Sequence, residues 1–192
     1  MARIKIATIT LLLLFCSQAI VADEGDDFSI TTLVEGLDHP WGIAFLPNGQ
    51  MLVTERPGQL RLVDHDKLHP QPIAGLPAIT EEGQGGLLDV ALHPDYKDNG
   101  WIYLSFSAAG DGGLGVEVIR GRLSKMRLVD IEPIFRVARK SSGGRHFGSR
   151  LLFDRKGLLY ISAGERGDRP RAQDLSDHAG SIIRLHDDGS IP

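Results

Sequence analysis

Two short glycine-rich segments of this 192-residue chain carry polar side chains that could reach a bound molecule. In Gly83–Gly86, three glycines surround Gln84, so the backbone can approach a ligand closely while the side chain offers an amide. In Ser141–Gly148, His146 lies among glycines, and an imidazole can accept a proton from a hydroxyl group near neutral pH. The alternatives are a plain glycine-rich turn for Gln84 and a structural hydrogen-bonding role for His146.

A third polar segment, Gly164–Arg169, follows an apolar run that ends at Ala163. Its Glu165 and Arg166 place a carboxylate and a guanidinium on one loop, a combination that can bind a polyol or an anion. A solvated ion pair is an equal alternative. The sequence has no phosphate-binding loop, no zinc-like spacing and no serine-nucleophile elbow, so we assign no metal ligand and no catalytic triad.

Composition excludes several classes of protein. Hydrophobic residues make up 42% of the chain and charged residues 24%, which is typical of a folded globular protein rather than a disordered one. One cysteine cannot form an intrachain disulfide framework. The formal net charge of −4 disfavours a nucleic-acid partner.

The N-terminus has the pattern of a signal peptide covering residues 1–22. Arg3 and Lys5 precede an apolar run from Ile9 to Phe15, which is too short to span a bilayer, and Ala22 ends a stretch of small residues. A membrane anchor is the alternative. We expect the mature protein to begin at residue 23, to be periplasmic or secreted, and not to insert into a membrane.

The elements that must position the polar segments are strands. Gly42–Phe45 and Met51–Thr54 flank a tight turn, and Leu60–Val63 alternates as a third strand would. Helical periodicity is scarce, and only Gln173–Gly180 has the pattern of a helical turn.

One strand–turn–strand pattern occurs three times. Its equivalent positions are Phe45, Leu92 and Phe153, so the periods are 47 and 61 residues. Repeats of roughly 40–50 residues with paired strands are typical of a β-propeller, with coincidental hairpins of a β-sandwich as the alternative. The longer period is explained by a flexible surface loop that we predict at Ala108–Gly115, which contains four glycines.

The length fits only part of a propeller ring. Propellers have about 4–8 blades, and the residues after the signal peptide hold about three and a half blades of this period. We therefore expect residues 23–192 to be the N-terminal part of a longer all-β protein.

Four motifs, in order, resemble the soluble pyrroloquinoline quinone (PQQ)-dependent sugar dehydrogenases of the glucose/sorbosone dehydrogenase family, and most closely the bacterial periplasmic aldose sugar dehydrogenases. The motifs are Leu37–Trp41, Glu55–Gly58, Gly83–Asp89 and His146–Arg150. The resemblance runs from about Leu33 to Pro192. It implies a six-bladed propeller of about twice this length, in agreement with the repeats.

The resemblance also implies an activity: oxidation of the C1 hydroxyl of an aldose sugar to a lactone, with hydride transfer to PQQ held on Ca²⁺ and an external electron acceptor. His146 matches the family's general base, and Gln84 matches its quinone-contacting glutamine. Gln84, Arg145 and Glu165 are the expected sugar contacts, although some members carry an acidic residue where Arg145 stands. The Ca²⁺ ligands are expected in later blades, so this chain alone is expected to be inactive.

Two other functions stay open. A propeller that binds without catalysis would tolerate replacement of His146 and Gln84. A propeller lactonase-type hydrolase would need converging Glu, Asp and Asn metal ligands on successive inner strands, and the sequence does not show such a set.

Overall fold

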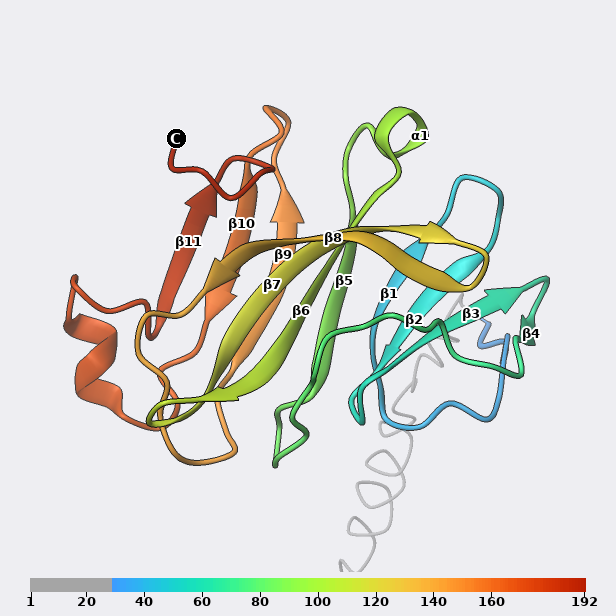
Figure 1. The fold of residues 1–192 in the computed structure, drawn as a ribbon. Helices are drawn as coiled ribbons and strands as arrows, with labels where there is room; N and C mark the ends of the chain where they lie inside the picture. Colours follow the sequence, from blue (N-terminus) through green and yellow to red (C-terminus); the bar gives the residue numbers. More distant parts are fainter. Residues whose placement is uncertain (1–28) are drawn as a thin grey trace, which may run out of the picture. The chain divides into compact units, whose positions relative to one another are not determined.

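Three antiparallel sheets contain the strands of this computed structural model, which describes residues 29–192 (Figure 1). The first has four strands: β1 (Pro40–Phe45), β2 (Met51–Glu55), β3 (Gln59–Asp64) and β4 (Lys67–Leu68). The second also has four: β5 (Leu87–Leu92), β6 (Trp101–Gly110), β7 (Gly113–Ser124) and β8 (Arg127–Arg136). The third has three: β9 (Gly148–Phe153), β10 (Leu159–Ala163) and β11 (Ser181–Leu185).

Each sheet is a meander, because its strands pair in chain order. The first strands of the three sheets lie in succession, with β1 against β5 and β5 against β9. This is the blade arrangement of a β-propeller, which confirms the fold predicted from the repeats. The three copies of the repeat are the hairpins β1–β2, β5–β6 and β9–β10. The described residues form two four-stranded sheets and one three-stranded sheet, which is part of a propeller ring.

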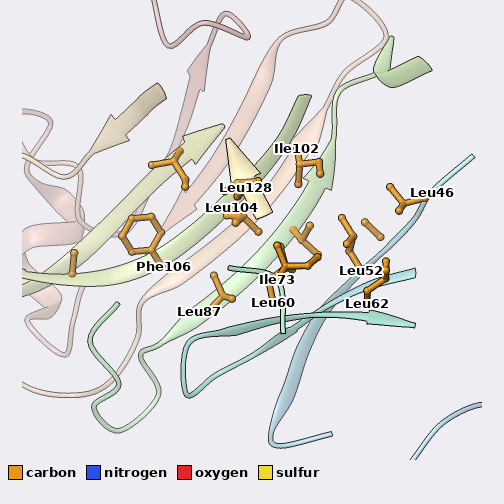
Figure 2. Packing of buried hydrophobic residues seen from close by; sticks show 14 residues of the cluster. Leu46, Leu52, Leu60, Leu62, Ile73, Leu87, Ile102, Leu104, Phe106 and Leu128 are labelled. Carbon is orange, nitrogen blue, oxygen red and sulfur yellow. The ribbon is translucent and has the colours of Figure 1, made fainter. Parts of the chain in front are cut away.

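Apolar side chains fill the spaces between successive blades. Leu52 and Leu60 of the first sheet pack with Leu87 and Leu104 of the second, and all four are fully buried (Figure 2). Tyr103, Leu159 and other residues form a second cluster between the second and third sheets. Each buried leucine contributes about 1.5–3 kcal/mol, so these clusters hold the blades in register.

Hydroxyl groups at equivalent positions also join neighbouring blades. Thr54 accepts a hydrogen bond from the amide of Gly42 in its own blade and donates to the carbonyl of Leu88 in the next, at 2.8 and 2.5 Å. Ser105 repeats this arrangement in the second blade and donates to the carbonyl of Ser149 at 2.7 Å. The hydrogen bond to the next blade is therefore repeated together with the strands.

Asp89 on β5 reinforces the junction between the second and third blades. Its buried carboxylate accepts hydrogen bonds from the amides of Val90 and Leu151, at 3.0 and 2.9 Å, and from Arg150 at 3.2 Å. A buried carboxylate is stable only when its oxygens are paired in this way.

The predicted flexible loop at Ala108–Gly115 is wrong. This stretch ends β6, turns tightly and begins β7, with Gly110 and Gly113 paired across the hairpin. Gly113 has a φ of 127°, and a Cβ there would lie 2.4 Å from the carbonyl oxygen of Ser141. The glycines therefore serve a close backbone approach rather than flexibility.

The helical turn predicted at Gln173–Gly180 is also misplaced. A 3₁₀ helix, η1, covers Arg169–Gln173, and the residues after it form turns. Asp174 accepts hydrogen bonds from the amide and hydroxyl of Ser176, which competes with helix formation. A single helical turn that we did not predict, α1, covers Tyr96–Asn99.

The predicted signal peptide lies outside the described residues. Within residues 29–192, no helix has the length and apolar character needed to cross a membrane.

Candidate functional site

Gln84 and His146, which are 62 residues apart, are brought together by the loops that precede β5 and β9. The Gln84 side-chain carbonyl accepts a hydrogen bond from the amide of His146 at 2.8 Å. The backbone amide of Gln84 donates a hydrogen bond to the backbone carbonyl of Gly144 at 2.6 Å. Side chain and backbone of Gln84 thus fix the loop that carries His146.

Close packing of these loops explains their glycines. Gly83 has a φ of 59°, and a Cβ there would lie 2.3 Å from the Gly144 carbonyl oxygen. A Cβ at Gly164 would lie 1.8 Å from the carbonyl oxygen of His146. Both positions exclude a side chain, so the glycine spacing noted in the sequence is a requirement of the site's backbone.

His146 forms a pair with Glu165 of the loop after β10. The His146 Nδ1 atom is hydrogen-bonded to the Glu165 carboxylate, and the His146 side chain is half-exposed. The hydrogen bond from His146 is the main cause that lowers the pKa of Glu165, and the amide of Gly167 contributes to the same effect. With Nδ1 donating to a carboxylate, a neutral imidazole carries its lone pair on Nε2, which can then accept a proton.

A cleft of about 300 Å³ adjoins His146 at the start of the three inner strands. Its lining combines apolar and polar side chains: Trp41, Arg56, Gln84, Leu88, His146, Phe147 and Gly148. The volume is at the lower end of small-molecule sites. A second hollow, of about 570 Å³, lies beside α1 and the β1–β2 turn and contains none of the predicted site residues.

Arg56 adds a guanidinium to the cleft lining, and the sequence analysis missed it as a site residue. Its Nη2 lies 3.5 Å from a carboxylate oxygen of Glu81, while its buried Nε has no hydrogen-bond partner among residues 29–192. Trp41 provides a flat apolar wall, with the guanidinium of Arg150 at 4.0 Å from its ring. Arg56 lies within the Glu55–Gly58 motif of the resemblance, which was the available signal.

Arg145 and Glu165 do not line the cleft. Arg145 is exposed, and its guanidinium packs on Gly167, where a Cβ would lie 2.5 Å from the arginine Nε. Glu165 contacts His146 instead, so the structure places it as a partner of the histidine. A sugar-binding role for either residue stays a prediction.

Over the described part of the chain, no cluster of three or more His, Cys, Asp or Glu residues is arranged to hold a metal ion.

Comparison with known proteins finds a matching family and several similar relatives. The family model described as Glucose / Sorbosone dehydrogenase matches residues 37–192. Aldose sugar dehydrogenase YliI of Escherichia coli (strain K12) is 46% identical over 168 residues, covering 85% of this chain and 45% of that protein.

Solved structures agree in fold. The apo-form of the soluble aldose sugar dehydrogenase from Escherichia coli has a TM-score of 0.82 at 46% identity, covering 85% of this chain and 48% of that chain. The PQQ-bound aldose sugar dehydrogenase from Streptomyces coelicolor has a TM-score of 0.75 at 30% identity, covering 84% and 48%. This chain spans about half the length of the curated relatives it matches.

Proposed function

The chain belongs to the glucose/sorbosone dehydrogenase family, and we propose that its protein oxidises the C1 hydroxyl of an aldose to a lactone with PQQ as hydride acceptor. The observation that carries this proposal is the Glu165–His146 pair beside the cleft, with Gln84 fixing the histidine loop. His39 and His65 also pair Nδ1 with a carboxylate, but among the described residues His146 is the paired histidine that lines the cleft.

His146 is the base in this proposal. Its Nε2 takes the hydroxyl proton of the sugar as the C1–H bond breaks, because a hydride leaves readily only from a carbon whose oxygen is losing its proton. Glu165 keeps Nδ1 protonated and stabilises the imidazolium that forms, and its lowered pKa keeps it a carboxylate at neutral pH.

The cleft residues fit a flat, anionic quinone. Trp41 offers an apolar face, Gln84 offers an amide, and Arg56 offers a guanidinium whose Nε has no partner among the described residues. A carboxylate is the natural acceptor for such a guanidinium nitrogen. When bound, PQQ accepts the hydride and its electrons.

We propose sugar oxidation for a protein of the length of these relatives, not for this chain alone. We assign no Ca²⁺ ligand to residues 29–192 and propose that the metal, the remaining quinone contacts and the wall facing His146 belong to later blades. On this proposal the isolated chain does not oxidise sugars. The signal-peptide pattern supports a periplasmic or secreted location, and an external acceptor reoxidises the cofactor.

The test uses a full-length protein containing this chain, loaded with PQQ and Ca²⁺, and follows reduction of an artificial dye by an aldose. We expect activity that requires PQQ and that is lost in His146→Ala but kept in His65→Ala, an exposed histidine remote from the cleft. Lactone hydrolysis without PQQ would instead support a hydrolase. Sugar binding without turnover, unaffected by His146→Ala, would support a binding module.

A further inference from the structure

Each of the three blades carries a hydroxyl at the same place on its second strand, but the third hydroxyl lacks a bond that the other two make. Thr54, Ser105 and Ser162 accept hydrogen bonds from a backbone amide of the first strand in their own blade, at 2.8, 2.9 and 3.0 Å. Thr54 and Ser105 also donate to a carbonyl of the next blade. Among residues 29–192, the Ser162 hydroxyl has no such acceptor. One hydrogen bond of the repeat is therefore left unmade at the third blade.

The first blade contains the position that the missing acceptor would occupy. The two accepting carbonyls, of Leu88 and Ser149, each lie one residue before the amide that donates to the hydroxyl of their own blade. Trp41 holds this position in the first blade, one residue before Gly42. The repeat thus supplies both halves of one more inter-blade hydrogen bond, the donor at Ser162 and the acceptor at Trp41.

The side chains beside Ser162 are apolar and exposed. Leu152 of β9 and Ile182 of β11 are 66% and 74% exposed. By strand register they are equivalent to Ala44 and Leu60 of the first blade, which are buried against the second blade. We call Leu152, Ser162 and Ile182 the third-blade face. It has the composition of a surface that a neighbouring blade covers elsewhere in the same molecule.

The first blade has the complementary surface. Ile43 and Phe45 of β1 are 51% and 67% exposed, and they are equivalent to Val90 and Leu92 of β5, which pack against the first blade. A hollow of about 240 Å³ with apolar lining lies beside Ile43 and Trp41. We call Trp41, Ile43 and Phe45 the first-blade face.

We propose that a second copy of this chain covers both faces, so that two copies form one closed ring. The third-blade face of each copy packs on the first-blade face of the other, and each Ser162 hydroxyl donates to the carbonyl of the partner's Trp41. The two contacts are related by a twofold axis, so association stops at the dimer.

The number of sheets supports a second copy as the occupant. Each copy supplies three sheets, so two copies supply six, within the range of about 4–8 blades in closed propellers. This chain also spans about half the length of its relatives, so two copies contain about as much chain as one of them. The inference rests on the fold and does not depend on the proposed sugar oxidation.

Sedimentation velocity of the purified full chain is the first test. We expect a single dimeric species that dissociates on dilution, without trimers or larger species. A monomer at the highest soluble concentration overturns the proposal. An open series of oligomers also overturns it, because the two faces would then meet without closing a ring.

Substitutions on the third-blade face are the second test. Ile182→Glu should give a folded monomer, because the side chain is exposed in a single copy but would bury a charge in the contact. Leu175→Glu is the matched control, since Leu175 is fully exposed outside both faces, and it should stay dimeric. Equal effects of the two substitutions on the dimer overturn the proposal.

Ser162→Ala keeps the test decisive if Ile182→Glu does not fold. It removes one neutral hydrogen bond from each of the two contacts, so the dimer Kd should rise by about 5–150-fold. An unchanged Kd would contradict the proposed bond to the partner's Trp41.

A mixing experiment shows which faces meet. Phe45→Lys and Ile182→Glu should each be monomeric alone. In a mixture, one contact has two unchanged faces and the other brings opposite charges together, so a 1:1 dimer of the two variants should reappear. If two third-blade faces met instead, Phe45→Lys alone would stay dimeric, and that result overturns the proposal.

Discussion

Asp89 and Arg166 are both charged and more than nine-tenths buried, yet their surroundings differ. Both carboxylate oxygens of Asp89 accept hydrogen bonds, from two backbone amides and from Arg150. Arg166 uses one guanidinium nitrogen and leaves two without partners among the described residues. The Asp89 region joins two blades, whereas the Arg166 region supports the loop of His146.

The difference separates charges that serve the fold from charges that can serve a ligand. A buried polar group whose partners all come from the protein has nothing left to offer a bound molecule. Arg56 and Arg166 each keep buried donors without a partner among the described residues. Substitutions in the two regions should therefore change different properties: stability at the blade junction, and turnover or ligand binding around His146.

The largest effect is expected at His146. Because a general base acts in the transition state, His146→Ala in the full-length protein should lower kcat by about 10²–10⁴-fold, or about 3–5 kcal/mol of barrier. Tm should change little, since the side chain is half-exposed. Steady-state kinetics and thermal unfolding on one preparation make the test. A drop in kcat of tenfold or less together with a lower Tm would make His146 a structural residue. The region around His146 would then not differ from the blade junction at Asp89.

The blade junction should respond in the opposite way. Asp89→Ala leaves the buried Leu151 amide without its acceptor, while the exposed Arg150 guanidinium turns to water, so we expect a loss of about 1–3 kcal/mol in the free energy of unfolding. Asp130→Ala is the control, because its exposed pair with Arg122 should contribute less than about 1 kcal/mol. Urea denaturation of both variants measures the difference, and equal losses would contradict the assignment.

How far the sequence anticipates each region depends on the range of the interactions. The hairpins β1–β2, β5–β6 and β9–β10 are predictable because alternation and turn residues act locally. The hairpin at Gly110–Gly113 was misread because what demands a glycine at Gly113 is the carbonyl of Ser141, which no local pattern reveals.

The site shows the same limit. Gln84 and His146 could be singled out by their glycine-rich settings, but their hydrogen bond spans 62 residues and depends on the blades packing side by side. The pairing of Glu165 with His146 likewise needs the loop after β10 to meet the loop before β9. The unpaired Nε of Arg56 is a property of burial, which a sequence does not display.

The ion pair between Asp177 and Arg171 offers a third test, because its contribution to stability depends on pH. The hydrogen bond from Arg171 is the main cause that lowers the pKa of Asp177 to about 2 from an ordinary value of 3.8. Because the folded-state pKa is the lower one, this carboxylate stabilises the fold fully above about pH 4 and progressively less as the pH falls toward 2.

The expected contribution is about 2 kcal/mol at neutral pH. Asp177→Asn should remove it and flatten the dependence of unfolding free energy on pH between about 4 and 2. Urea denaturation across that range compares the variant with the wild type. Parallel curves for the two proteins would show that the Arg171–Asp177 pair does not carry this pH dependence.

Gln84→Ala should have the smallest effect. Its side chain makes one neutral hydrogen bond to the amide of His146, worth about 0.5–1.5 kcal/mol net, and water can replace it because Gln84 is exposed. In this variant the backbone amide of residue 84 still donates to the carbonyl of Gly144, so the loop that carries His146 keeps one of its two hydrogen bonds to this segment. We therefore expect kcat of the full-length protein to fall less than about tenfold. KM should rise if the Gln84 side-chain amide also contacts the ligand. Gln50→Ala, at a polar turn remote from the cleft, is the control. A loss as large as that of His146→Ala would mean that Gln84 acts on the reacting atoms rather than on the position of the histidine loop.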